Sequence, residues 1–350
     1  MTIKTKRSLA RAASLEMMPT RLTINSTSRL LLLVLLTLPT VVQAQFAYEF
    51  TNNTIIITGY SGPGGAVVIP SEVNNVPVTS IGEDAFEYND GLSSVTIPNT
   101  VTNIGDNAFY ACYFLTNITI PNGLISIGVN AFYACGGLTV VTVPDSVISI
   151  GAYAFILCGG LRSVTIPNSV TTIGDDAFAG CGGLTGVTIG SSVASIGNDA
   201  FLNCGGLITV TIPASLTNIG DNAFNSCSGL TSVYFEGNAP AIDSFVFSGD
   251  NYVTFYYLPG TVGWRPFLVN RPAVLWNPQV QPGSFGVRNN QVGFNITGSS
   301  NLVVVVEACT NLANPTWYAL QTNTLNGDSL YFTDPQWTNH PARFYRLQMP

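Results

Sequence analysis

The feature that most constrains this chain is a repeat of 23 residues. An Ala-Phe dipeptide recurs at this spacing, and an Ile-Gly pair begins five positions before each phenylalanine. The phenylalanines of this column are Phe86, Phe109, Phe132, Phe155, Phe178, Phe201 and Phe224. A fixed period held in several columns at once is typical of a solenoid, in which each unit buries its apolar side chains only against its neighbours.

A single repeat indicates what each coil contains. Val164, Thr165 and Ile166 alternate apolar and polar, which predicts a strand with one buried face, and Pro167 ends it. The Ile-Gly-x-x-Ala-Phe stretch is too short for an independent helix and is expected to form one helical turn at most. The predicted fold is a horseshoe-like, mostly β solenoid. It has a parallel sheet on one face and short helical turns on the other.

The repeat columns also resemble a known family. Ile-Pro, Ile-Gly-x-x-Ala-Phe and a cysteine recur in phase over roughly residues 67–262, as in the BspA-like leucine-rich repeats of bacterial surface proteins. The resemblance implies a leucine-rich repeat solenoid on or outside the cell, in a family associated with adhesion and with host or matrix contact. It implies no catalytic residues, because the motif residues are core positions.

The segments outside the repeats differ from them in composition. Residues 1–44 combine basic residues, the apolar run Leu30–Leu38 and small residues up to Ala44, which predicts a secretory signal peptide. We expect an N-terminal cap over 45–70 and the repeat array over 71–264, with a five-residue insertion near 71–78. Proline-rich residues 265–289 are expected to be a cap and linker. Alternating apolar residues over 290–350 predict a small β-sandwich-like module.

The charge of the chain after residue 44 excludes some partners. This part retains six arginines, no lysine and eighteen acidic residues, so its formal charge is −12. Nucleic acids and anionic membrane surfaces attract basic patches, and neither is an expected partner. No membrane span is expected once the signal peptide is removed. The predicted location is secreted or at the cell surface.

A column of cysteines follows the phenylalanines. It comprises Cys112, Cys135, Cys158, Cys181, Cys204 and Cys227. A zinc site is disfavoured, because ligand pairs normally lie a few residues apart and no histidine is near. Stacked coils bring these thiols close enough for disulfides, so two interpretations stay open. We expect a structural ladder of buried free thiols, and pairwise oxidation is the alternative.

An acidic column follows each Ile-Gly pair, as in Asp175-Asp176 and Asp221-Asn222. Such residues can cap the free N–H groups of the following turn, which is the expected role. Calcium binding is the alternative, but Val129 and Ala152 interrupt the column, and calcium needs six or more oxygen ligands. No metal is predicted.

The polar strand column is the candidate contact surface. It comprises Thr96, Thr119, Thr142, Thr165, Thr188, Thr211 and Tyr234, with Arg162 beside it. The simpler interpretation is cross-strand packing of residues that favour strands. Ice binding is disfavoured, because the adjacent polar column is irregular and the sheet should curve.

Catalysis has little support in the sequence. The only histidine is His340, no lysine follows residue 44, and no Gly-x-Ser-x-Gly motif occurs. We therefore predict a non-enzymatic extracellular or cell-surface scaffold without a cofactor. It would bind a protein or glycan through the sheet face in an adhesion-type role. The alternative is a structural envelope or matrix component without a specific ligand.

Overall fold

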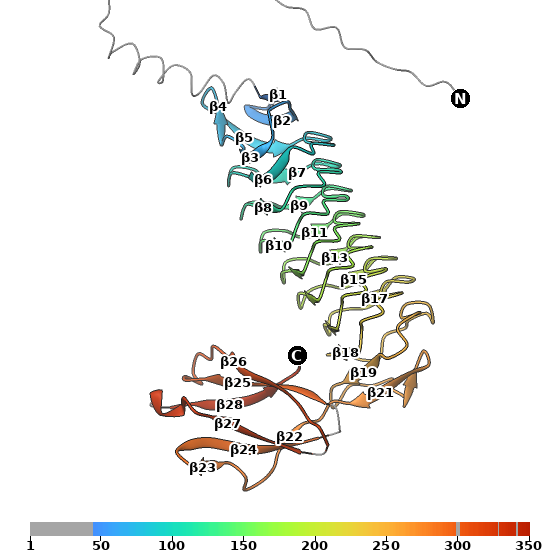
Figure 1. Cartoon of the computed structure of the whole chain (residues 1–350), viewed down its shortest axis with the longest axis vertical. Helices are drawn as coiled ribbons and strands as arrows, with labels where there is room; N and C mark the ends of the chain where they lie inside the picture. Colours follow the sequence, from blue (N-terminus) through green and yellow to red (C-terminus); the bar gives the residue numbers. More distant parts are fainter. Residues whose placement is uncertain (1–44, 299–301, 328, 341) are drawn as a thin grey trace, which may run out of the picture. The chain divides into compact units, whose positions relative to one another are not determined.

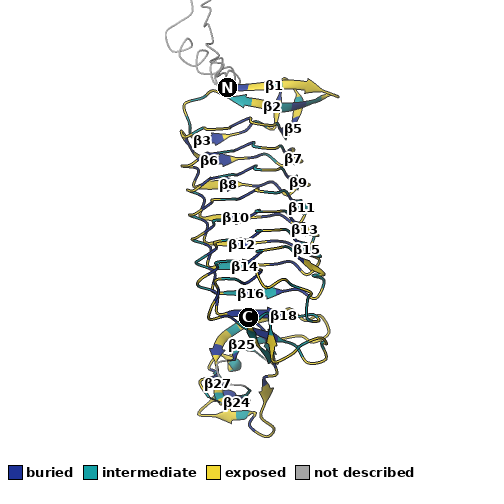
Figure 2. Cartoon of the chain, turned by 90° about the vertical axis from the view of Figure 1, so that its right-hand side faces the viewer, coloured by how far each residue is buried: buried dark blue, intermediate teal, exposed yellow. Residues whose placement is uncertain are grey.

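The repeats form the coils of a solenoid, and each coil contributes two strands to two separate ladders (Figures 1 and 2). The computed structural model describes residues 45–298, 302–327, 329–340 and 342–350. The expected signal peptide, residues 1–44, lies outside the described residues. Phe46 onward form one compact unit.

The first ladder contains the strands expected from the Val-x-Ile-Pro pattern. They are β3 (Gly65–Val68), β6 (Leu92–Thr96), β8 (Asn117–Thr119), β10 (Val140–Thr142), β12 (Ser163–Thr165), β14 (Gly186–Thr188), β16 (Thr209–Ile212), β18 (Ser232–Phe235) and β19 (Thr254–Tyr257). They pair in parallel as β3-β6-β8 and, from β10 onward, as one longer sheet. Val164 aligns with Val141 and Val187, one repeat away on either side. This register keeps each column on one face, and the predicted solenoid is confirmed.

The second ladder runs through the residues just before each Ile-Gly glycine. Its strands are β5 (Val76–Ile81), β7 (Asn103–Ile104), β9 (Ser126–Ile127), β11 (Ser149–Ile150), β13 (Thr172–Ile173), β15 (Ser195–Ile196) and β17 (Asn218–Ile219). Backbone bonds such as Gly174 N–H to the Ile150 carbonyl, 3.0 Å, join successive coils here. The sequence pattern did not reveal this ladder, because two residues are too few to show an alternation.

The turns after the second ladder contain no helix, which differs from the short helical turns expected there. Their backbone groups bond to the next coil instead, as in Phe155 N–H to the Ala177 carbonyl at 2.8 Å. Two residues of each turn have positive φ, for example Asp199 at 54° and Asn203 at 59° in one turn. This alternation of handedness prevents a helical turn and holds the backbone open for bonds between coils.

The phenylalanine column fills the centre of the solenoid. From Phe86 to Phe247, successive rings lie 4.9–5.4 Å apart between centroids and within 14° of parallel. Such offset stacking is a favourable geometry for aromatic pairs. The first ring is covered by Tyr60, 5.4 Å away, and the last packs on Phe255 at 4.9 Å. The core is therefore closed at both ends by side chains from outside the repeated column.

The N-terminal end is covered by two hairpins. Strands β1 (Phe46–Thr51) and β2 (Thr54–Tyr60) are antiparallel, and β2 pairs in parallel with β5. The insertion expected near residues 71–78 forms a second hairpin, in which β4 (Glu72–Val73) pairs with β5. Asn74 and Asn75, with φ of 53° and 63°, form its two-residue turn, a conformation that asparagine tolerates well.

At the other end, the first ladder continues past the last repeat. Strand β21 (Arg271–Leu275) pairs in parallel with β19 and forms a hairpin with β20 (Phe267–Leu268). Strands β22 (Gln279–Val280) and β23 (Gly286–Arg288) belong to the next sheet instead. The segment 265–289, expected to be a cap and linker, thus supplies strands to both parts of the chain.

The C-terminal module consists of two sheets. In one, β24 (Gln291–Thr297) pairs with β22, β23 and β27 (Ser329–Asp334). In the other, β25 (Val303–Cys309) lies between β26 (Tyr318–Thr324) and β28 (Phe344–Gln348). A short 3₁₀ helix, η1 (Trp337–Asn339), follows β27. Phe294, Val304 and Phe332 pack between the sheets, as expected for a β-sandwich-like module.

Candidate functional site

The threonine column lies on the outer face of the first ladder, as the strand alternation predicts. Thr96, Thr119, Thr142, Thr165 and Thr188 are exposed, whereas the valine or isoleucine that precedes each of them packs against the core. Thr211 is half-buried, and its hydroxyl donates to the Pro350 carbonyl at 2.7 Å. The column is therefore open to solvent over its first five positions and covered at the sixth.

Two adjoining hollows follow the open part of this column, with volumes of about 480 and 570 Å³. Thr165, Asn168 and Thr188 line both, so the two hollows form one groove across successive coils. Asp145 lines one end, and Glu236 the other. Burial raises the pKa of Glu236. We call this surface the threonine groove. It presents hydroxyls, amides and carboxylates, and none of the described residues that line it is aromatic or basic.

Tyr234 was expected to extend the exposed column, and this expectation is wrong. Its side chain is fully buried and stacks on Tyr256, with ring centroids 5.1 Å apart. Both rings belong to a core cluster with Trp276 and Phe294, so residues of the C-terminal module cover this end of the sheet face. The sequence could not show this, because the contact joins segments far apart in the chain.

Arg162 is exposed, but it does not line the threonine groove. Arg162 immediately precedes β12. A Cβ added to Gly183 of the next coil would lie 3.2 Å from Arg162 Nη1. The Arg162 guanidinium thus lies against the turn that precedes β14 in the next coil. The structure does not bring Arg162 and Tyr234 together into one site.

The cysteine column is buried beside the phenylalanines. All six of its cysteines, and Cys309, are free and buried in the structure. Each thiol of the column donates to the carbonyl of the phenylalanine 26 residues earlier, at 3.1–3.2 Å, as Cys158 does to Phe132. Burial raises the pKa of Cys158 to about 12. A thiol suits this position, because it is small and apolar and still donates a weak hydrogen bond.

The acidic column joins coils and does not cap its own turn as expected. Asp175 Oδ1 accepts the backbone N–H of Asn198 at 2.7 Å, and Asn198 Oδ1 accepts that of Asp221 at 2.9 Å. The second residue of each pair has the positive φ that asparagine and aspartate tolerate best. In the described part of the chain, no group of three or more His, Cys, Asp or Glu side chains is placed to hold a metal ion.

Asp250 occupies the cysteine position of the last coil and is fully buried. Neither of its carboxylate oxygens has a hydrogen-bond partner among the described residues. Burial raises its pKa to about 7, although the charge of Arg271 opposes that shift. The Arg271 guanidinium is itself held by the Phe247 carbonyl, to which Nη2 donates at 3.1 Å.

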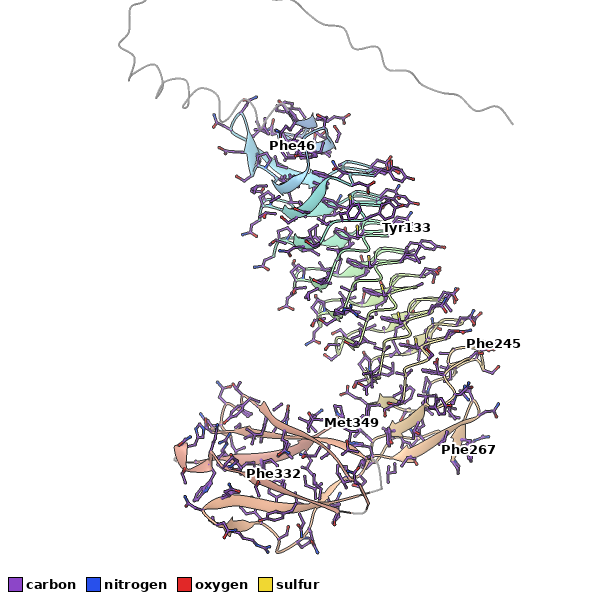
Figure 3. The ribbon with its side chains drawn as sticks, viewed as in Figure 1. Phe46, Tyr133, Phe245, Phe267, Phe332 and Met349 are labelled. Carbon is purple, nitrogen blue, oxygen red and sulfur yellow. The ribbon has the colours of Figure 1, made fainter. Side chains whose placement is uncertain are left out.

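A group of aromatic residues that the repeat pattern does not predict lies on the turn side of the first coils. Tyr110 and Tyr133 stack with centroids 4.4 Å apart, and Tyr88 packs edge-on against Tyr110 at 5.4 Å. Figure 3 shows Tyr133 on this side of the coils. The usable signal was the irregularity of this column, since later coils carry isoleucine, alanine, leucine, asparagine or serine at the position of Tyr110 and Tyr133.

Comparison with known proteins supports the repeat assignment. A family model described as the BspA type leucine rich repeat region matches six copies, over residues 68–181 and 148–263. A leucine rich cell surface protein from Faecalibacterium prausnitzii A2-165 has a solved structure with 31% identity and a TM-score of 0.54, covering 66% of this chain and 71% of that chain.

A second solved structure is more distant. The leucine rich repeat protein of T. pallidum is 27% identical, with a TM-score of 0.35, covering 65% of this chain and 89% of that chain. No curated protein matches the chain. Among the residues that the structure describes, no helix is both long and apolar enough to cross a membrane.

Proposed function

The chain belongs to the BspA-type leucine-rich repeat family, and from that premise we propose that it is a non-enzymatic scaffold that binds a protein partner in the threonine groove. Repeat solenoids of this kind present extended surfaces that suit macromolecular partners. The location that accords with this role is outside the cell or on its surface, as for the similar cell surface protein of Faecalibacterium prausnitzii.

One observation carries the proposal. The threonine groove crosses several coils, and its strands present outward hydroxyls at every coil from Thr142 to Thr188. Hydrogen-bonding groups about 4.8 Å apart on successive strands form an elongated row of contacts. An elongated row suits an extended polypeptide better than a compact small molecule.

The composition of the groove limits the chemical classes of partner that suit it. Asp145 and Glu236 contribute carboxylates, and the described lining residues include no arginine. Complementary charge therefore favours a neutral or basic segment of polypeptide. Glycans are commonly held by stacking on aromatic rings, and the absence of such rings from the lining residues makes a glycan the less suited partner.

The test uses purified protein from residue 45 onward on an array of extracellular matrix proteins and glycans. Thr165→Arg places a long cation in the middle of the groove, and Glu87→Arg adds the same side chain to an exposed position on the turn side. We expect a protein on the array to bind the wild type and the Glu87→Arg variant, and to bind Thr165→Arg at least about tenfold more weakly. Equal binding by all three proteins would contradict the proposal, and retention of glycans alone would assign a different ligand class.

A further inference from the structure

The C-terminal module contains a further hollow, which shares no lining residue with the threonine groove. Its volume is about 470 Å³, within the usual range of ligand pockets, roughly 300–1,000 Å³. Val280, Phe285, Phe294, Leu312 and Trp317 line it, together with Arg343 and the first four residues of β28, 344–347. Phe285 is 57% exposed, Leu312 54% and Val280 41%, so large apolar side chains gather here at the surface.

The hollow runs along the free edge of β28. This strand pairs with β25 on one side and has no second neighbour in the described sheet. Successive side chains of a strand point to opposite faces. A hollow lined by five consecutive residues therefore follows the edge of the strand, where unpaired backbone N–H and C=O groups point outward. β28 contains no proline or lysine, the residues that commonly protect such an edge.

Two arginines lie beside this edge. The Arg343 side chain is only 4% exposed, and Nη1 lies 3.0 Å from Asp334 Oδ2. Even so, its Nε and Nη1 make no hydrogen bond with any described residue. Arg346 lies over the Trp317 ring at 4.6 Å, and its Nε donates to Glu307 Oε2 at 2.6 Å. Its side chain is still 44% exposed, so the guanidinium can bind a further carboxylate partner. The exposed guanidinium of Arg346, and not the buried and ion-paired Arg343, is therefore the donor that a partner can reach.

We propose that the free edge of β28 binds an extended peptide segment of a partner protein. The segment adds as a further strand, places an apolar side chain in the hollow and presents a carboxylate to the exposed arginine. Backbone hydrogen bonds supply affinity in this mode, and the pocket supplies specificity. A second copy of β28 is a poorer occupant, because symmetric antiparallel pairing about Arg346 sets two arginines opposite each other.

The test uses fluorescein-labelled hexapeptides and the protein from residue 45 onward. The peptides carry Phe, Leu or Val at alternate positions, threonine between them and a terminal aspartate. A matched set has N-methylated backbone amides, which keep the side chains and remove the donors. Fluorescence anisotropy should show binding of the unmethylated set and no binding of the methylated set.

Substitutions then test whether the peptides bind at the edge of β28 and not at another exposed apolar surface. Phe285→Ala and Phe344→Ala should each weaken binding at least about tenfold. Phe245→Ala removes a ring of similar exposure, 60%, from the array and should leave affinity unchanged, as should Thr165→Arg. Equal binding of the methylated set, full competition by 3-phenylpropanoate, or failure of every peptide to bind the wild type would overturn the proposal.

Discussion

At the scale of single residues, a few turns place a residue with a bulky side chain at a position of positive φ, which should lower the stability of the array. Each coil contains two positions with positive φ, and these are filled mainly by asparagine, aspartate, glycine or small residues. Leu157 is an exception, with a φ of 60° and a side chain that is 49% exposed. Asn203 occupies the same position two coils later, with a φ of 59°. Exchanging leucine and asparagine at positions 157 and 203 therefore measures the strain of positive φ at equivalent positions of two coils.

We expect Leu157→Asn to stabilise the array by roughly 0.5–1 kcal/mol, because asparagine adopts this conformation more readily than leucine. The reverse substitution, Asn203→Leu, should destabilise it by a similar amount. Urea unfolding monitored by circular dichroism measures both. A gain in stability from both substitutions would show that exposed apolar surface, and not φ, decides the effect.

The buried carboxyl of Asp250 should make stability depend on pH. Its pKa is about 7 in the folded protein, against an ordinary value of 3.8. Between these values the unfolded chain releases the proton and the folded protein keeps it. The free energy of unfolding should therefore fall as pH rises from about 4 to 7. Asp250→Asn should remove this fall and raise the melting temperature at pH 7.5. A pH profile that is the same in the variant would contradict the assignment.

The cysteine column gives a third prediction at this scale. Each thiol already donates to a backbone carbonyl and is buried from oxidants. We therefore expect seven free thiols when the protein is denatured without reductant and titrated with Ellman's reagent. One free thiol would instead indicate that the column had paired into disulfides.

At the scale of the elements, the spacing between coils depends on the glycine of each Ile-Gly pair. A Cβ at Gly174 would lie 2.5 Å from the Ala152 nitrogen and 2.7 Å from the Gly151 carbonyl carbon. Both atoms belong to the backbone of the preceding coil, so they cannot move aside without separating the second ladder. This close approach explains why glycine recurs at the position.

Gly174→Ala should therefore destabilise the protein by roughly 1–3 kcal/mol, the range for overpacked sites. Gly182 provides a matched control in the same repeat, because a Cβ there meets nothing within 4 Å. Gly182→Ala should leave the midpoint of urea unfolding nearly unchanged. Equal losses at both positions would mean that loss of glycine itself, and not contact between coils, is responsible.

At the scale of the whole molecule, the C-terminal module covers part of the array. Tyr234 and Tyr256 of the sheet face share a core cluster with Trp276 and with Met349, which Figure 3 marks. The Trp276 indole donates to the Val303 carbonyl at 3.0 Å. The sheet face therefore stays open from Thr96 to Thr188, and the threonine groove lies over the last coils of this open part.

Removing residues 277–350 should expose this aromatic surface. We expect the truncated protein to bind anilinonaphthalene sulfonate with increased fluorescence and to self-associate in sedimentation experiments, because exposed apolar patches promote both. The full-length protein is the control. Unchanged dye fluorescence and a monomeric truncated protein would show that the array itself buries the two tyrosines.

The sequence by itself determined the coil, because a 23-residue period leaves one way to align Val164 with Val141 and to bury Phe178 between its neighbours. It also placed Thr165 on the outer face, since side chains alternate along a strand.

Only the tertiary structure decided which part of that face stays open. Tyr234 has the same place in the local pattern as Thr165, and it is buried by a module that begins some forty residues later in the chain. The second ladder and the bond from Asp175 to the next coil could not be predicted from the sequence either, because they join backbones one repeat apart. Local periodicity specifies the direction of a side chain, whereas its exposure depends on contacts between distant segments.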